Sequence, residues 1–521
     1  MGCATTAGRA RLQGRRGLLL ALALTAGCSG TPSARRSTPA PSPTAVPSAT
    51  GSPSATPQPQ PAFYRQRLAW KGCGEGFSCS TLHVPLDYAR PAGRSIDVAV
   101  VRLPAQGPGR RIGSLVINPG GPGGSGVDYA RYARYLFPAK VRARFDVVGF
   151  DPRGVARSTP VRCLTDRELD AFLGAPAVPR TPAETAALVA ASKHFAAACA
   201  AKNGELLAHV GTLDTARDMD VLRAALGDPK LTYLGKSYGT YLGAKYAELF
   251  PGRVRALALD GALDPALGGD RLNAGQSNGF EANLRDFLTA CVRDGGCPLG
   301  ASPAAAEAGL NSLLATIERS PLPGSGTRRL GPGPALFGLA AGLYSPENGW
   351  PRLESALAAA RKGDGAKLLA LADGLADRGP DGHYSNQLEA NTAVNCIDRP
   401  WPALPAVAAQ AGTDARTAPH FGAGLAYSSL TCSYWPVRPV EQPHPVRAAG
   451  APPILVVGTT GDPATPYAWS QGLARGLMSG VLLTFEGDGH TAYGKGSTCV
   501  DDAVNSYLIE LRTPSPGTVC H

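Results

Sequence analysis

The sequence contains no apolar run long enough to cross a membrane. The longest one, residues 17–27, falls well short of the roughly 20 residues that a spanning helix needs, so a polytopic membrane protein is excluded. Lysine and arginine are not clustered among aromatic side chains, and despite the net charge of +11 we expect no nucleic-acid binding. Cysteine pairs with the spacing CxxC are also missing, which argues against a zinc site.

The first 62 residues have the composition of an export signal followed by a tether. A basic stretch at 9–16 and an apolar stretch at 17–25 precede Ala26, Gly27 and Cys28. This order predicts a signal peptide over 1–27 that ends in a lipobox, with Cys28 as the acylated first residue of the mature chain. An ordinary secretory signal with an incidental Cys28 is the alternative. The Ser/Thr/Ala/Pro-rich residues that complete 28–62 bury too little apolar surface to fold, so we expect a tether.

The chain is therefore expected to be exported, either as a lipoprotein on the outer face of the cell membrane or as a secreted protein. The cysteine count agrees with an oxidising compartment, because ten of the twelve cysteines remain once Cys3 and Cys28 are set aside. Many pairings of ten cysteines are possible. Pairing sequence neighbours closes the shortest loops, and it predicts the disulfides Cys73–Cys79, Cys163–Cys199, Cys291–Cys297, Cys396–Cys432 and Cys499–Cys520.

Apolar strand patterns alternate with helical patterns in two separate parts of the chain. Strands are expected at 80–87, 95–103, 114–118, 145–150, 231–234, 254–259, 454–457 and 481–485, and helices at 215–226, 238–250, 467–477 and 499–511. This alternation predicts an α/β fold with a mostly parallel sheet. Between the two parts, amphipathic helices replace strands. We therefore expect a core over 63–265, an inserted helical lid over 266–447 and the rest of the core over 448–521.

The sequence GKSYG at 235–239 matches the pattern G-x-S-x-G. It follows an expected strand and opens an expected helix, which is the setting that a nucleophile elbow requires. A glycine turn between a strand and a helix is the alternative. We interpret Ser237 as a catalytic nucleophile.

A serine hydroxyl needs a base to take its proton, and the base needs a carboxylate to orient it. His490 follows the strand expected at 481–485, and Asp462 follows the strand expected at 454–457. Thr465 is expected to cap the next helix and so to fix the loop that carries Asp462. Asp488 competes for the role, but it lies only two residues from His490. The order Ser237, Asp462, His490 is that of the α/β-hydrolases.

Acyl transfer also requires N–H donors for the oxyanion. The glycine-rich sequence NPGGPGGSG at 118–126 follows an early strand, and its backbone can bring N–H groups together. We expect one donor from Gly121 and the other from Tyr238, directly after the nucleophile. A phosphate-binding loop is the alternative, but the Lys-Ser/Thr pair of a P-loop is absent.

These motifs, with the stretches FDVVGFDPRGVARSTPVRC and VVGTTGDPATPY, resemble the secreted tripeptidyl aminopeptidases of actinomycetes, which are α/β-hydrolases related to proline iminopeptidase. The resemblance runs from about residue 63 to residue 520 and is weakest in the lid. It implies an α/β-hydrolase fold with a triad of Ser237, Asp462 and His490. It also implies an oxyanion hole of Gly121 and Tyr238, and release of short N-terminal peptides from polypeptide substrates.

The expected function is that of an exported serine peptidase that acts near a free N-terminus through an acyl-enzyme, without a metal or other cofactor. An exported carboxylesterase with the same triad is one alternative, and a non-catalytic binding lipoprotein is another. An aminopeptidase must also pair the buried ammonium of its substrate. Glu389 and Asp398, in the expected lid, are the candidate anchors for that amine, with ordinary surface acids as the competing interpretation.

Overall fold

A computed structural model describes residues 62–107 and 109–521 of the chain. The predicted signal peptide, Cys28 and all but the last residue of the predicted tether lie outside the described residues. Within the described ranges, no helix is both long enough and apolar enough to cross a membrane.

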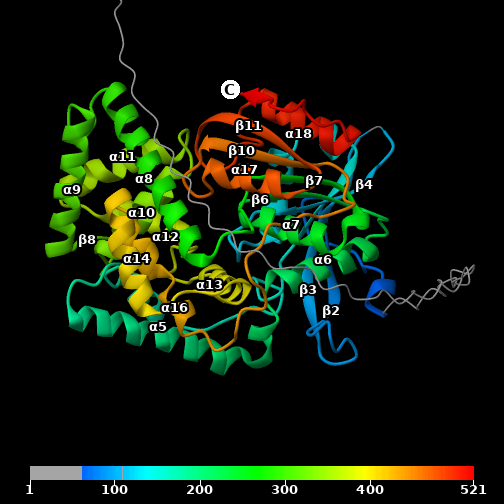
Figure 1. The fold of residues 1–521 in the computed structure, drawn as a ribbon, viewed down its shortest axis with the longest axis horizontal. Coiled ribbons are helices and arrows are strands. Elements are labelled where there is room, and N and C mark those ends of the chain that lie inside the picture. Colours follow the sequence, from blue (N-terminus) through cyan, green and yellow to red (C-terminus); the bar gives the residue numbers. More distant parts are fainter. Residues whose placement is uncertain (1–61, 108) are drawn as a thin grey trace, which may run out of the picture. The chain divides into compact units, whose positions relative to one another are not determined.

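A ten-stranded mixed sheet organises the part of the molecule that lies on the right in Figure 1. In spatial order its strands are β1 (Lys71–Gly72), β2 (Ser78–Pro85), β3 (Ser95–Leu103), β5 (Phe145–Phe150), β4 (Gly113–Asn118), β6 (Leu231–Lys236), β7 (Val254–Asp260), β10 (Ile454–Gly461), β11 (Gly480–Asp488) and β12 (Val519–Cys520). Pairing is antiparallel from β1 to β5 and parallel from β5 to β12. The predicted α/β class with a mostly parallel sheet is therefore confirmed.

The central strands are buried on both faces, which explains their continuous apolar sequences. Every residue of β4 and of β5 is buried. Along β4, Val116 packs into one hydrophobic cluster, while Leu115 and Ile117 pack into a second cluster. The alternation of side chains along a strand thus places two apolar layers on opposite faces of the sheet.

Helices cover the sheet and extend beyond it. Those near the sheet are α1 (Gly126–Arg131), α2 (Ala133–Leu136), α3 (Ala139–Arg142), α6 (Thr212–Ala225), α7 (Tyr238–Leu249), α17 (Tyr467–Gly476) and α18 (Thr498–Glu510). The segment between β7 and β10 forms α8 (Gly269–Arg293), α9 (Pro303–Arg319), α10 (Pro332–Leu343), α11 (Gly349–Arg361), α12 (Ala366–Leu375), α13 (Gln387–Asp398), α14 (Leu404–Thr417), α15 (Gly422–Ser428) and α16 (Leu430–Ser433), with a small hairpin of β8 (Leu322–Pro323) and β9 (Arg329–Leu330).

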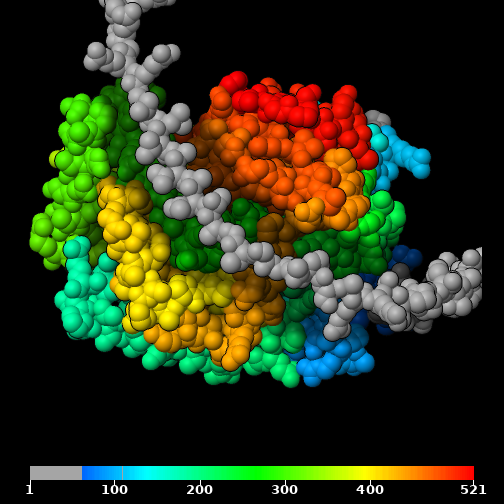
Figure 2. Space-filling model, in the orientation of Figure 1, coloured from blue at the N-terminus to red at the C-terminus, as the bar shows by residue number. Residues whose placement is uncertain are grey.

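This inserted segment has an apolar core of its own, which includes Phe280, Leu310 and Leu357. Figure 2 shows its green and yellow residues gathered to one side of the orange and red residues of the C-terminal part. Two further helices join it from the first part of the chain, α4 (Asp166–Gly174) against α10 and α5 (Pro182–Asn203) against α16. We call α4, α5 and α8 to α16 the helical layer. It is built from two segments of the chain, whereas the sequence interpretation placed it in 266–447 alone.

Five disulfides stiffen the described part. They join Cys73 to Cys79, Cys163 to Cys199, Cys291 to Cys297, Cys396 to Cys432, and Cys499 to Cys520. These are the same five pairs of sequence neighbours that the cysteine spacing predicts. The Cys396–Cys432 bridge ties α13 to α16 within the helical layer.

Candidate active site

Ser237 lies on the turn between β6 and α7. Its backbone has φ 54° and ψ −126°, a left-handed conformation that is costly for a residue with a side chain. The Ser237 N–H donates to the carbonyl oxygen of Asp260 at 2.9 Å, which secures the turn to the end of β7. The side chain is half-buried, at the carboxyl edge of the parallel strands. Ser237 therefore has the strained strand-to-helix setting of a nucleophile elbow.

His490 and Asp462 lie together at the same edge of the sheet, on the loops that follow β11 and β10. The Nδ1 atom of His490 lies 2.9 Å from one carboxylate oxygen of Asp462 and 3.0 Å from the other. Burial alone would raise the pKa of Asp462. Attraction to His490 and hydrogen bonds from neighbouring groups outweigh it, so the pKa of Asp462 lies below its ordinary value. The carboxylate is thus held in its charged form beside the imidazole.

The loop around Asp462 differs in one respect from the sequence interpretation. Thr465 does not cap α17, which begins at Tyr467 with Pro466 at its N-cap. Instead the Thr465 hydroxyl donates to Asp462 Oδ2 at 2.9 Å, and the backbone N–H of Thr465 donates to Asp462 Oδ1 at 2.8 Å. The expected N-cap was therefore wrong, because the hydroxyl has a stronger partner in the buried carboxylate.

Ser237 and His490 both lie beside the end of β7. A Cβ atom placed on Gly261 would lie 3.3 Å from His490 Cε1. The Ser237 N–H donates to the carbonyl oxygen of Asp260, the residue directly before Gly261. Within 62–107 and 109–521 no hydrogen bond joins the Ser237 hydroxyl to His490. Such catalytic bonds are often long before substrate binds, so the arrangement remains compatible with proton transfer.

The glycine-rich loop packs directly against the elbow. Gly120 has φ +99°, and a Cβ atom there would lie 2.8 Å from Ser237 Cβ and 3.1 Å from the Tyr238 nitrogen. In the described part of the chain, the N–H groups of Gly121 and Tyr238 have no hydrogen-bond acceptor. Two N–H groups beside the serine are therefore available to an oxyanion.

A buried carboxylate that the sequence interpretation missed holds the loop carrying His490. Asp260, at the end of β7, accepts the N–H groups of Ala492 at 2.9 Å and Tyr493 at 3.0 Å. Lys236, directly before Ser237, lies 3.5 Å from the same carboxylate and donates to the Tyr493 carbonyl. An acid at the end of the apolar strand VRALALD was the available signal, since strand ends meet at one edge of a parallel sheet.

The inserted helical segment touches His490. Between α10 and α11, the Tyr344 carbonyl oxygen accepts the His490 N–H at 3.0 Å. The Tyr344 ring meets the imidazole edge-on, with 5.4 Å between ring centroids. This contact places the segment directly over the candidate base.

The two acids expected to bind a substrate amine have other partners. Glu389 is 0% exposed, and its Oε1 atom accepts the N–H groups of Cys163 and Leu164 at 2.5 and 2.8 Å. Asp398, 4% exposed, accepts both the N–H and the hydroxyl of Thr212, at 2.8 and 2.6 Å. Both carboxylates are enclosed and accept protein donors, but among the described residues Glu389 Oε2 has no hydrogen-bond partner. The amine-binding role of this pair stays a prediction.

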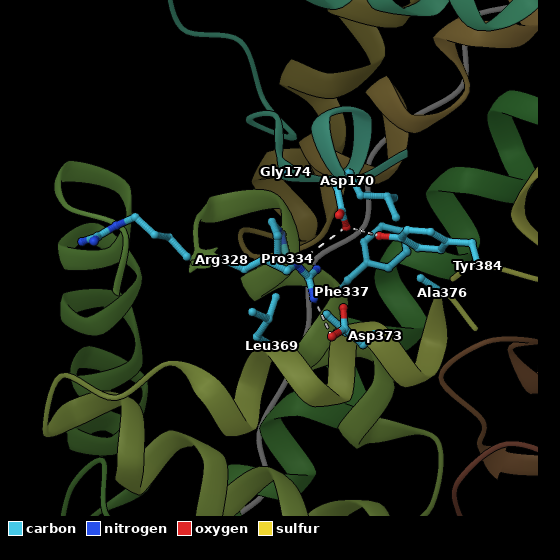
Figure 3. A pocket seen from close by; sticks show the side chains of 12 residues that line it. Asp170, Gly174, Arg328, Pro334, Phe337, Leu369, Asp373, Ala376 and Tyr384 are labelled. Atoms are coloured by element: carbon cyan, nitrogen blue, oxygen red, sulfur yellow. Dashed lines mark hydrogen bonds and ion pairs between the residues drawn. The ribbon is translucent and has the colours of Figure 1, made fainter. Parts of the chain in front are cut away.

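A separate cavity of about 140 Å³ lies among α4, α10 and α12 (Figure 3). Three of its four charged side chains form ion pairs with one another. Arg328 is paired with Asp373 at 2.6 Å and with Asp170 at 3.6 Å, and Tyr384 donates to Asp170 at 2.8 Å. Arg329, the fourth, forms no ion pair with the described residues and donates to the Pro321 carbonyl oxygen instead.

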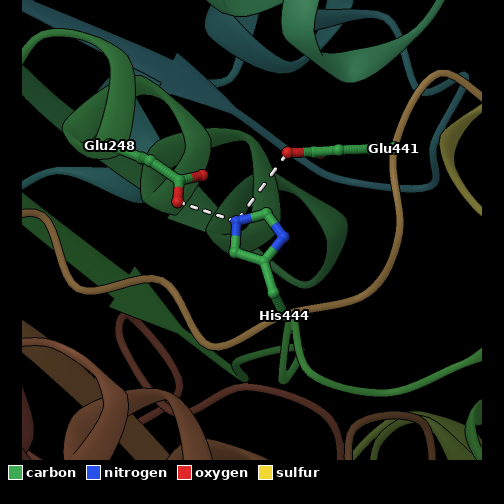
Figure 4. A group of neighbouring side chains, drawn as sticks. All are labelled: Glu248, Glu441 and His444. Carbon is green, nitrogen blue, oxygen red and sulfur yellow. Dashed lines mark hydrogen bonds and ion pairs between the residues drawn. The ribbon is translucent and has the colours of Figure 1, made fainter.

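Glu248, Glu441 and His444 converge on one another away from the serine (Figure 4). The buried ammonium of Lys245 lies 2.9 Å from each carboxylate and 3.3 Å from the imidazole. Hydrogen bonding to Gln442 and Glu248 raises the pKa of His444. The cluster already contains its cation, and it ties α7 to the segment that enters β10.

The chain is similar to known hydrolases over most of its length. The family model described as TAP-like protein matches residues 418–520. The chain is 42% identical to "Serine protease Hip1" of Mycobacterium tuberculosis over 462 residues, 85% of this chain and 87% of that one. It is 39% identical over 472 residues to "Carboxylesterase B" of the same species, 87% of this chain and 89% of the relative. It is 32% identical over 481 residues to "Tripeptidyl aminopeptidase" of Streptomyces lividans, 88% of this chain and 87% of the relative.

Proposed function

Because the chain belongs to the tripeptidyl aminopeptidase family of α/β-hydrolases, we propose that it is an exported serine peptidase that cleaves short peptides from a free N-terminus. The observation that carries the proposal is the His490–Asp462 pair beside the strained elbow of Ser237. The names of two relatives, a serine protease and a tripeptidyl aminopeptidase, support peptide bonds as the target.

The proposed mechanism is acyl transfer through Ser237. His490 Nε2 takes the hydroxyl proton while the serine oxygen attacks the scissile carbonyl, and Asp462 holds the Nδ1–H side of the imidazole. The N–H groups of Gly121 and Tyr238 stabilise the oxyanion of the tetrahedral intermediate. His490 then gives the proton to the leaving amine. Water, deprotonated by the same imidazole, hydrolyses the ester and restores the serine.

A carboxylesterase is the second candidate function, because a relative with 39% identity carries that name. The same residues would serve both reactions, since ester and amide hydrolysis share the tetrahedral intermediate. A peptidase must in addition protonate a poor amine leaving group, which requires His490 to reach the leaving nitrogen. Matched arylamide and ester substrates with one acyl group therefore separate the two functions.

Export is the proposed location, on the strength of the signal-like residues 1–27 and the five disulfides. Acylation of Cys28 would attach the chain to the outer face of the membrane through a lipid and leave the folded part outside. Peptides with a free N-terminus are the proposed partners.

The test of function combines active-site labelling with substrate choice. A fluorophosphonate probe is expected to label wild type and Ser312→Ala, a matched change on the exposed face of α9, but not Ser237→Ala. Persistent labelling of folded Ser237→Ala would overturn the assignment of the nucleophile, and an unlabelled wild type would favour a binding lipoprotein.

Substrate choice then tests the aminopeptidase function. Tripeptide-arylamides with a free amine are expected to have kcat/KM at least about tenfold above their N-acetylated forms. Equal cleavage of the two forms would exclude an aminopeptidase.

A further inference from the structure

Helix α13 is linked to both segments that supply the two free N–H groups beside Ser237, directly to the glycine-rich loop and through Thr212 of α6 to Tyr238. At its first turn it lies against the glycine-rich loop, where a Cβ atom on Gly123 would be 2.5 Å from the Gln387 carbonyl oxygen. The Asn391 side-chain amide donates to the Pro122 carbonyl at 3.0 Å, and Asn395 donates to the Asn391 oxygen at 3.0 Å. The amide of Asn391 is thereby oriented toward the residue that follows Gly121.

At its last residue, α13 reaches Tyr238 through a buried chain of hydroxyl groups. The Tyr238 hydroxyl lies 2.5 Å from Thr212 Oγ1, and Thr212 Oγ1 donates to Asp398 at 2.6 Å. Because the Thr212 proton is committed to the carboxylate, the Tyr238 hydroxyl must be the donor in the other bond. The chain therefore runs in one direction, from Tyr238 through Thr212 to Asp398.

The helix is itself fixed to the core along its length. The N-cap residue Asn386 bonds to backbone groups of Gly154, Ala156 and Val161 at 2.8 to 3.0 Å. In the middle of the helix, Glu389 accepts the two N–H groups described above. Near its end, the disulfide of Cys396 holds α16. α13 is thus a rigid support rather than part of a loosely attached lid.

We propose that α13 sets the position of the oxyanion-binding N–H groups, with Asn391 and Asp398 as its positioning residues. Asn391 fixes the loop of Gly121, and Asp398 fixes Tyr238 through Thr212. The inference rests on the proposed function, in which these two N–H groups hold the oxyanion. Preorganised donors act on charge that develops in the transition state, so their displacement lowers kcat and leaves substrate binding largely unchanged.

The experiment measures kcat and KM for a peptide-arylamide, or for the matched ester if wild type cleaves only esters. It also measures the affinity of a peptide boronate, whose tetrahedral adduct with serine places an oxygen at the two donors. Thr212→Val and Asn391→Leu are each expected to lower kcat at least about tenfold, to weaken boronate binding by a similar factor and to leave KM within about twofold.

Two variants serve as controls. Thr212→Ser keeps the hydroxyl and is expected to retain kcat within about twofold. Thr392→Val makes the same chemical change within α13 at a hydroxyl that bonds to the carbonyl of Leu388 in its own helix, and it is expected to do the same. Melting temperatures and near-UV circular dichroism establish that each variant is folded. If Thr212→Val does not fold, Tyr238→Phe cuts the chain at its other end.

The outcomes separate the inference from the proposed function. Folded Thr212→Val and Asn391→Leu with unchanged kcat and unchanged boronate affinity would overturn the role of α13 while the peptidase stands. The role of α13 would also be overturned if KM rose by the same factor as boronate affinity fell while kcat stayed unchanged. In that case α13 would act on substrate binding. A wild type that neither cleaves these substrates nor reacts with fluorophosphonate would overturn the function and the inference together.

Discussion

Replacing Asp260 by asparagine should loosen the loop that carries His490. The carboxylate accepts two backbone N–H groups, from Ala492 and Tyr493, and both bonds are buried. Asparagine offers one oxygen and turns an NH2 group toward a donor. One charge-assisted bond is then lost and the other becomes neutral, which together cost about 2–4 kcal/mol of unfolding free energy.

Activity should fall with stability, because Ala492 is only two residues from His490. We expect kcat of Asp260→Asn to drop about tenfold while KM stays within about twofold, since the imidazole loses its position rather than the substrate its contacts. Urea unfolding with the disulfides intact measures stability, and arylamide hydrolysis measures kcat. Asp502→Asn is the matched control, since its carboxylate is 70% exposed and pairs with Lys140 at the surface.

A second variant tests the partner of this carboxylate. Lys236→Met removes the ammonium that lies 3.5 Å from Asp260, and the double variant completes a cycle. The effects on stability should be non-additive because the two side chains share the Tyr493 segment. If Asp260→Asn unfolds at the wild-type urea concentration and keeps its kcat, the carboxylate does not hold the loop and the reasoning fails.

Three further predictions concern other parts of the chain. Asp462→Asn should lower kcat at least about 10³-fold with little change in KM, because the amide favours the wrong imidazole tautomer; a variant within tenfold of wild type would contradict this. Burial raises the pKa of Asp398 to about 6, despite hydrogen bonds from Thr212. The free energy of unfolding due to this group should therefore fall by about 3 kcal/mol as the pH rises from about 4 to 6 and then level off. Urea unfolding of wild type and of Asp398→Asn at several pH values measures this change as the difference between the two proteins. Curves of unfolding free energy against pH that run parallel for the two proteins would refute the prediction. Cys28→Ala should move the protein from the detergent phase to the aqueous phase in detergent partitioning, whereas equal aqueous partitioning of both proteins would exclude the anchor.

The parts of the fold with strong local patterns could be predicted from the sequence. The strand expected at 95–103 coincides with β3, and the helix expected at 467–477 differs from α17 by one residue at its end. Helices α4 and α5 were not expected, although both begin with capping boxes, at Thr165 and Thr181. The Ala-rich α5 has a weak amphipathic pattern, and only its packing shows that it belongs to the helical layer.

The candidate site also has a part that could be predicted from local sequence and a part that could not. The predicted residues that the structure brings together lie at strand ends, where the topology of a parallel sheet fixes their neighbourhood. For Glu389 and Asp398, sequence spacing shows where each acid lies in the chain but not which protein donors its oxygens accept. Asp260 was missed for the related reason that its partners, Ala492 and Tyr493, lie more than 200 residues away.

The connectivity of the disulfides has a consequence for how the chain is made. The five bridges follow one another along the sequence without interleaving, and the widest spans 36 residues. A chain that emerges N-terminus first can therefore oxidise each pair before the cysteines of the next pair appear. At every stage the nearest available thiol is the native partner, so the order of emergence itself selects the correct pairing. Such a chain has little need for an isomerase, and circular permutation between Cys163 and Cys199 would create that need.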